Sequence, residues 1–267
     1  MTETPCLQID AFTDRPFRGN PAAVCLLDDE GDPAWMQAVA AEMNLAETAF
    51  VRPLDDGFEL RWFTPTLEVD LCGHATLASA HALWQEGIVG DRHPIHFHTK
   101  SGILSCTRQG ALIELDFPAT PVAATDAPAG LCSALGVEPV FVGRSKFDYL
   151  VLLESEAAVR AVQPDFRLLG EVATRGIIVT GVSAEPGIHF VSRFFGPAAG
   201  IDEDPVTGSA HCALGPFWGE RLGKATMTGL QASARSGIVR VRLAGDRVVL
   251  GGQAVTVMKG VLTGISA

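Results

Sequence analysis

The sequence predicts an α+β protein of two similar domains, each built mostly from strands around one central helix. Two observations predict this fold class. A glycine turn followed by a helix of small apolar residues occurs twice, at 68–80 and again at 202–214. A helix that is apolar on all sides has to be enclosed by other elements. The segments around both helices are strand-like, so the sequence predicts two sheet-wrapped helices in a duplicated fold.

The composition is that of a folded, acidic protein. Of the 267 residues, 47% are hydrophobic and 19% are charged, which predicts a well-buried core. The net charge of −11 argues against nucleic acid and anionic membranes as partners. No apolar run approaches the ~18 residues of a membrane helix, and the first residues lack the pattern of a signal peptide. The six cysteines form no CxxC pair, so we expect a cytoplasmic protein.

The first half of the chain alternates strands with two helices. Asp32 and Pro33 are good residues for the start of a helix over 34–43, because Asp caps the first turn and Pro fits its first position. The second helix is the apolar one that follows Gly73. Strands are predicted over 6–12, 22–27, 44–51, 58–63, 95–99, 102–106 and 111–117.

Glu47 has two interpretations. Period-two alternation places it on the same strand face as Leu45, Ala49 and Val51. It can lie on the solvent side of an edge strand, since Glu is rarely fully buried. Alternatively, it is a partly desolvated acid or base with a raised pKa.

The second half follows a Pro- and Ala-rich linker over 116–130. Helices are predicted over 131–135, 156–161 (with Ser155 as cap) and 209–221. A further helix starts after Asp165 and is expected to end near 174–176. The expected strands cover 139–143, 148–153, 177–180, 188–195, 237–243, 247–250 and 254–258.

The two glycine turns predict a pair of anion-binding sites. Gly73 and Gly208 let the backbone approach a ligand, and the helix start after each carries unpaired N–H groups and the positive end of the dipole. His74 and Ser209 follow these glycines. We therefore expect one small carboxylate-bearing substrate. No nucleotide-binding motif occurs, and His96 and His98 lack an evident third ligand, so neither a cofactor nor a metal is expected.

Five segments then resemble the PhzF family of phenazine-biosynthesis-like isomerases. They are residues 17–24 (FRGNPAAV), 44–50 (NLAETAF), 61–65 (RWFTP), 72–76 (CGHAT) and 203–210 (EDPVTGSA). The resemblance implies the diaminopimelate-epimerase fold, in which two domains, each a barrel-like and mostly antiparallel sheet around a helix, flank the active site. It places the domains at 1–117 and 118–267, with the end of the chain returning to the first.

The resemblance also implies a mechanism, which is a cofactor-independent isomerisation by proton transfer. It assigns the proton shuttle to Glu47, with His74 and Asp204 as further catalytic residues. Gly73, Gly208 and Ser209 are implied to bind the substrate. Asn20 is a further candidate for substrate binding, or it only shapes the Gly-Asn-Pro turn.

One position departs from the epimerase pattern. Cys72 matches one of the two catalytic thiols of epimerases, but the second falls at Pro205, which has no acid–base chemistry. Cys72 is then a relic, a packing residue or a reactive thiol. The alternatives to the isomerase are therefore a residual Cys72 epimerase and a non-catalytic module that binds small molecules or proteins. Exposed sheet edges favour a homodimer.

Overall fold

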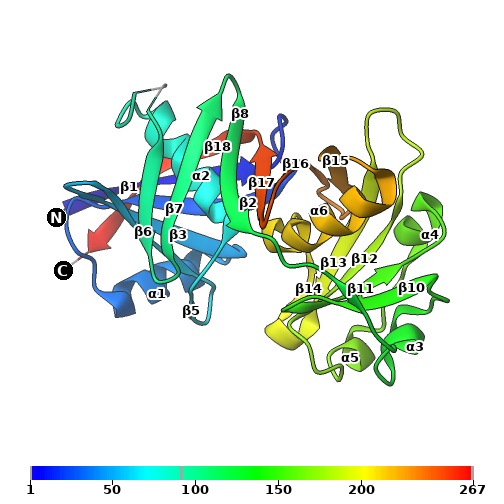
Figure 1. The fold of residues 1–267 in the computed structure, drawn as a ribbon. Coiled ribbons are helices and arrows are strands. Elements are labelled where there is room, and N and C mark those ends of the chain that lie inside the picture. The colour runs from blue at the N-terminus through cyan, green and yellow to red at the C-terminus, as the bar shows by residue number, and fades with distance from the viewer. Residues whose placement is uncertain (1, 91–92, 266–267) are drawn as a thin grey trace. The chain divides into compact units, whose positions relative to one another are not determined.

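The computed structural model describes residues 2–90 and 93–265. The chain divides into two compact units (Figure 1). The first unit combines the residues up to Asp116 with the segment that begins at Gly251, and the second unit runs over Phe117–Leu250. Each unit has its own set of strands and its own central helix.

The sheet of the first unit is mixed and mostly antiparallel. Its strands pair in the order β18-β1-β2-β3-β4-β6-β7-β8, and the β2/β3 and β4/β6 pairs are parallel. A short strand, β5, also pairs with β4. The bounds are β1 Thr2–Ala11, β2 Asn20–Leu26, β3 Glu47–Leu54, β4 Gly57–Phe63, β5 Glu68–Val69, β6 Ile95–Thr99, β7 Gly102–Gln109, β8 Leu112–Pro118 and β18 Ala254–Ile265.

Helix α2 (Gly73–Gln85) is the central helix of the first unit. It packs against β1, β2, β3 and β18, and every residue from His74 to Ala80 is buried. Helix α1 (Pro33–Met43) packs against β3 and β4 and begins as predicted, because the Asp32 carboxylate accepts a hydrogen bond from Trp35 N at 3.1 Å. The helix predicted to be apolar on all sides after Gly73 is thus enclosed by the strands around it.

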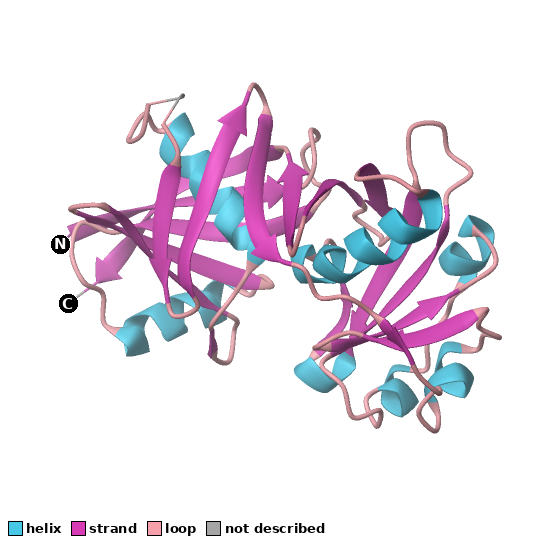
Figure 2. Ribbon diagram, viewed as in Figure 1, coloured by secondary structure: helices cyan, strands magenta, loops and turns pink. Residues whose placement is uncertain are grey.

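The second unit repeats the plan with different connections. Its strands pair in the order β9-β10-β11-β12-β13-β15-β16, with β14 beside β13, and the β11/β12 and β13/β15 pairs are parallel. Figure 2 shows the strands of this unit with several short helices around them. The strand bounds are β9 Ala123–Ala124, β10 Phe141–Arg144, β11 Asp148–Leu152, β12 Gly176–Val182, β13 Phe190–Gly196, β14 Ile201–Asp204, β15 Thr226–Gln231, β16 Gly237–Ala244 and β17 Arg247–Gly252.

The central helix of the second unit is α6 (Gly208–Leu222), which packs against β15 and β16. Most of its residues are buried, as the sequence predicted. The remaining helices are α3 Leu131–Leu135, α4 Glu156–Ala161, α5 Phe166–Leu169 and the 3₁₀ turn η1 Pro197–Ala199.

In the second unit the predicted end of the helix after Asp165 was wrong, and strands β9, β14 and β15 were not predicted. The helix after Asp165 ends at Leu169 rather than near 174–176, with Gly170 as its C-cap residue. Strand β15 was not predicted at all, because Gly229 interrupts its short run of strand-forming residues.

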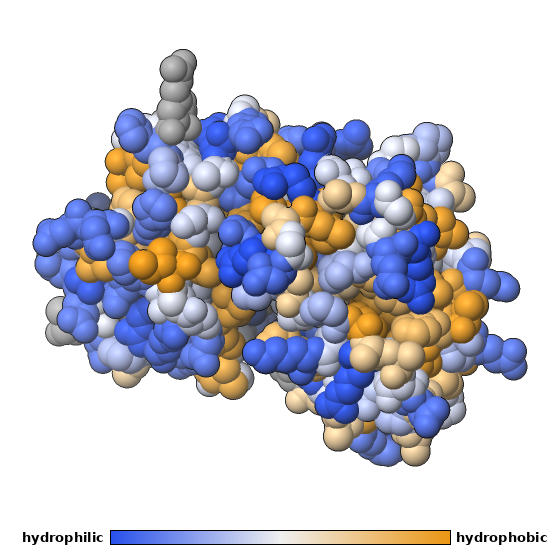
Figure 3. Space-filling model, viewed as in Figure 1, coloured by the Kyte–Doolittle hydropathy of each residue, from blue (hydrophilic) through white to orange (hydrophobic). Residues whose placement is uncertain are grey.

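The surface is mixed in character. Figure 3 shows hydrophilic residues over much of the visible face, with smaller groups of apolar residues between them. Among the described residues, no helix has both the length and the apolar character needed to cross a bilayer.

Candidate active site

Glu47, Cys72 and His74 come together in the first unit. Glu47 opens β3, Cys72 is the N-cap residue of α2, and His74 lies in the first turn of that helix. The His74 Nε2 atom lies 3.3 Å from Glu47 Oε2, and the Cys72 Sγ atom lies 3.6 Å from His74 Nδ1. The predicted shuttle and its predicted partner are therefore neighbours.

The Glu47 side chain is largely withdrawn from solvent. It is 15% exposed, and Ala49 and Val51, which share its strand face, are buried. Strand β3 pairs with β2 on one side and with β4 on the other, so it is an interior strand. The interpretation of Glu47 as a solvated residue of an edge strand is therefore wrong.

Asn20 orients the His74 ring. It is fully buried at the start of β2, and its Nδ2 atom lies 3.2 Å from His74 Nδ1. An amide nitrogen only donates, so Nδ1 accepts and the neutral ring carries its proton on Nε2, the nitrogen beside Glu47. Asn20 is thus more than a turn residue. Its predicted contact with substrate stays a prediction.

Cys72 is buried next to the titratable pair rather than inside an apolar cluster. It is 6% exposed, and its sulfur faces His74 instead of capping α2. A helix N-terminus and a nearby histidine favour the thiolate form of Cys72, and its burial opposes that form. Gly73 follows it as the first residue of α2.

The second unit holds the loop that leads into α6. The Gln231 side chain organises this loop: it accepts a hydrogen bond from Thr207 N and donates to Asp204 O, each at 2.8 Å. The Thr207 hydroxyl donates to the Asp204 carboxylate, so it does not cap α6. These bonds fix the approach to Gly208, the first residue of the helix.

Ser209 is paired with an arginine that sequence reasoning missed. Arg175 Nη2 donates to Ser209 Oγ at 3.1 Å, and the same guanidinium makes a bidentate pair with the buried Asp148 carboxylate. Burial raises the pKa of Asp148, and Arg175 opposes that shift. Because Ser209 Oγ accepts from Arg175, its own proton is directed to another acceptor. No motif marks Arg175, and only the fold brings it to the start of α6.

His211 is a core residue and not part of a site. It is fully buried, its Nδ1 atom lies 2.8 Å from Thr207 O, and burial lowers the pKa of His211 to about 4. A ring that burial keeps neutral and that bonds the backbone at the start of its own helix has a structural role.

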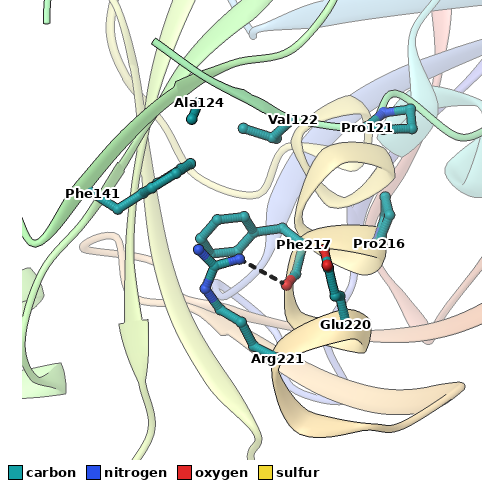
Figure 4. A pocket seen from close by; sticks show the side chains of 8 residues that line it. All are labelled: Pro121, Val122, Ala124, Phe141, Pro216, Phe217, Glu220 and Arg221. Atoms are coloured by element: carbon teal, nitrogen blue, oxygen red, sulfur yellow. Dashed lines mark hydrogen bonds between the residues drawn. The ribbon is translucent and has the colours of Figure 1, made fainter. Parts of the chain in front are cut away.

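A separate hollow of about 450 Å³ lies beside α6 (Figure 4). Arg221 lies over the Phe217 ring there, 3.6 Å from its centroid, and donates a hydrogen bond to Phe217 O. None of the predicted site residues lines this hollow. Its lining residues are Pro121, Val122, Ala124, Phe141, Pro216, Phe217, Glu220 and Arg221.

Comparison with known proteins finds relatives along nearly the whole chain. Residues 9–260 match the sequence profile of the family described as "Phenazine biosynthesis-like protein". An uncharacterized isomerase of Halalkalibacterium halodurans is 53% identical over 263 residues, which cover 98% of this chain and 99% of that protein. A crystal structure of a PhzF-family phenazine biosynthesis protein from Enterococcus faecalis matches with a TM-score of 0.94 at 38% identity, covering 98% and 99% of the two chains.

The fold extends to epimerases. A hydroxyproline epimerase from Agrobacterium vitis is only 12% identical but matches with a TM-score of 0.62 over 97% of this chain and 92% of that one. At that identity the likeness concerns the fold alone. The predicted α+β fold of the diaminopimelate-epimerase type is confirmed.

Proposed function

This chain belongs to the PhzF family of phenazine-biosynthesis-like proteins, a family of isomerases on an epimerase-type fold, and from that premise we propose how it works. It moves a proton within a small carboxylate substrate, without a cofactor, and Glu47 is the group that removes and returns the proton. The observation that carries this proposal is the sheltered Glu47 carboxylate beside the His74 ring.

The geometry suits a single carboxyl that acts first as base and then as acid. A general base works best when its pKa lies near the operating pH, and burial moves a carboxyl in that direction. His74, held by Asn20 with its proton on Nε2, can hydrogen-bond the Glu47 carboxylate before the proton is taken up. Catalysis of this type is typically worth ~10²–10⁴-fold in rate.

Substrate binding is assigned to the starts of the two central helices. Gly73 and Gly208 begin these helices, whose N-termini favour negative charge. The Ser209 hydroxyl, which accepts from Arg175, is free to give its proton to a carboxylate oxygen. Asp204 is the third catalytic group of the proposal, and its position is set by Thr207.

The test is proton exchange in D₂O. The enzyme is incubated with a panel of small cyclic and amino carboxylates, and the products are read by NMR and mass spectrometry. The wild type should shift a double bond or incorporate deuterium, and Glu47→Gln should lower the rate by at least ~10²-fold. Glu42→Gln, on the exposed side of α1, is the matched control and should behave like the wild type.

A Glu47→Gln protein that folds normally and keeps full activity would contradict the proposal. If no compound turns over while some still raise the melting temperature, the function is that of a small-molecule-binding module. NMR is required beside mass, because a sheltered carboxyl can pass a proton internally without exchange with solvent.

The position of Cys72 favours one second candidate, an epimerase that uses this thiol as its base. The sulfur is buried 3.6 Å from His74 Nδ1, within the same cluster as Glu47. Cys72→Ala separates the two candidates. Turnover that survives in Cys72→Ala but not in Glu47→Gln excludes the thiol as base, and the reverse pattern favours it.

A further inference from the structure

The three side chains around His74 are also a set of metal ligands. A thiol, an imidazole and a carboxylate are the donors that Zn²⁺ takes in proteins. One donor atom from each of Glu47, Cys72 and His74 lies within 4.8 Å of the other two. In the part of the chain that the structure describes, no other trio of His, Cys, Asp or Glu side chains is this close together.

The distances are close to those of a tetrahedral zinc site. Bonds of about 2.3 Å to sulfur and about 2.0 Å to nitrogen place those two ligand atoms about 3.5 Å apart. Cys72 Sγ and His74 Nδ1 are 3.6 Å apart. The backbone already places these two ligands, because they are the N-cap and second residue of one helix.

Glu47 has to move to complete the site. It lies beside Nε2 of the ring, whereas Cys72 lies beside Nδ1, and one ion binds only one of the two nitrogens. The three donor atoms already lie within 4.8 Å of one another, and a rotation of the Glu47 side chain brings its carboxylate toward the ion. An ion at Nδ1 also replaces the Asn20 amide there.

We propose that Glu47, Cys72 and His74 bind one Zn²⁺ ion, which blocks the proton shuttle. The Cys72 thiol releases its proton to solvent as the sulfur–zinc bond forms, and nothing is oxidised or reduced. The bound carboxylate of Glu47 can no longer accept a proton from substrate. Zinc is therefore a reversible inhibitor here and not a cofactor, and this consequence rests on the proposed function of Glu47.

Binding is measured on the whole protein and needs no turnover. Titration calorimetry with Zn²⁺ should give one site per chain, and Co²⁺ should give the near-ultraviolet absorption of a thiolate–cobalt bond. Cys72→Ala should abolish that absorption and weaken Zn²⁺ binding by at least tenfold, and Glu47→Gln should weaken binding as well. Cys132→Ala is the control, because Cys132 is the cysteine with the most exposure among the six, and it should change nothing.

A second measurement on the wild type avoids variants that fail to fold. Zn²⁺ should protect Cys72 from alkylation by iodoacetamide, as read by peptide mass, and EDTA should restore its labelling. Unchanged labelling of Cys72 in the presence of Zn²⁺, or equal Zn²⁺ affinity in the wild type and in Cys72→Ala, would overturn the site.

The inhibitory role has its own readout. With any substrate found by proton exchange, Zn²⁺ should suppress turnover and EDTA should restore it. If the isomerase proposal fails, the zinc-binding and labelling results still hold. If the zinc site fails, the effect of Glu47→Gln on turnover still holds. Full turnover at a Zn²⁺ concentration that fills the site would refute the blocking role.

Discussion

At the scale of single residues, the two central helices each carry a histidine near their start, with opposite environments. The His74 ring contacts three polar side chains, Asn20, Glu47 and Cys72. The His211 ring is enclosed and bonds only the backbone carbonyl of Thr207 among its described hydrogen bonds. The first ring faces polar and titratable side chains, and the second is held neutral by burial.

The neutral state of His211 makes stability depend on pH. The folded pKa is about 4 against an ordinary 6.5, so the unfolded chain takes up this proton first as the pH falls. The free energy of unfolding should therefore fall by roughly 3 kcal/mol as the pH is lowered from 6.5 to 4, because of this one group, and should level off below pH 4. Burial also lowers the pKa of His81, so this group too reduces the free energy of unfolding as the pH falls.

Urea unfolding at several pH values checks this expectation. His211→Asn, whose amide can still donate to Thr207 O, should lose stability less steeply than the wild type across that range. An identical slope in both proteins would show that His211 titrates normally.

Arg175 should matter for stability as well as for Ser209. Its guanidinium is the bidentate partner of Asp148, whose carboxylate is almost completely buried. Arg175→Met leaves that charge alone and should cost about 3 kcal/mol. The double variant Arg175→Met with Asp148→Asn should recover much of the loss, as measured by chemical unfolding. A double variant no more stable than Arg175→Met would mean that packing of the guanidinium on Phe147 and Phe194 dominates.

The residues also show what the sequence could predict. Alternation placed Glu47 on the face of Ala49 and Val51, but burial depends on β2 and β4 flanking β3. Pairing between segments far apart in the chain leaves no local pattern. For the same reason no sequence motif indicates that Asn20 contacts His74 or that Arg175 contacts Ser209. Each contact joins two residues that are far apart in the chain and that only the fold brings together.

At the scale of elements, strand β15 explains how α6 is positioned. The sequence pattern did not predict this strand, because Gly229 interrupts its run of strand-forming residues. The glycine is required: a Cβ atom there would lie 2.4 Å from the Phe190 ring. The strand ends at Gln231, whose side chain bonds Asp204 and Thr207 just before α6.

Gln231→Met should therefore disturb the second helix start. The change keeps the side-chain volume but removes the bonds to Thr207 N and Asp204 O inside a buried loop. We expect a loss of about 2 kcal/mol in unfolding free energy. Turnover should fall too, because the loop that holds Asp204 and leads to Ser209 is no longer fixed. Gln163→Met, at an exposed position, is the control for the added apolar side chain. Equal unfolding midpoints for the two variants would contradict the role of Gln231.

At the scale of the whole molecule, the second unit is an insertion into the first. Strand β18 pairs with β1 along most of its length, from Thr4 with Leu262 to Ala11 with Ala254. Nothing in the local sequence of β1 indicates a partner some 250 positions away, and the return of the chain end was expected only from the family resemblance.

This connection predicts the effect of a deletion. A chain that stops at Leu250 lacks β18, so β1 loses one pairing partner and α2 loses one of the strands that cover it. The first unit should unfold while the second, whose residues 117–250 are continuous, should stay folded. Limited proteolysis with mass spectrometry should then release a resistant fragment near 117–250. Equal resistance of the first unit would show that β18 is dispensable.

The same insertion sets an order of events on the ribosome. Residues 117–250 are complete before β18 is made, so the second unit can fold while the first still waits for its last strand. Asn20, Glu47, Cys72 and His74 are made well before β18, yet the sheet around them closes only when that strand is available. A chain that has not yet received β18 therefore presents an open β1 edge, to which another strand can pair.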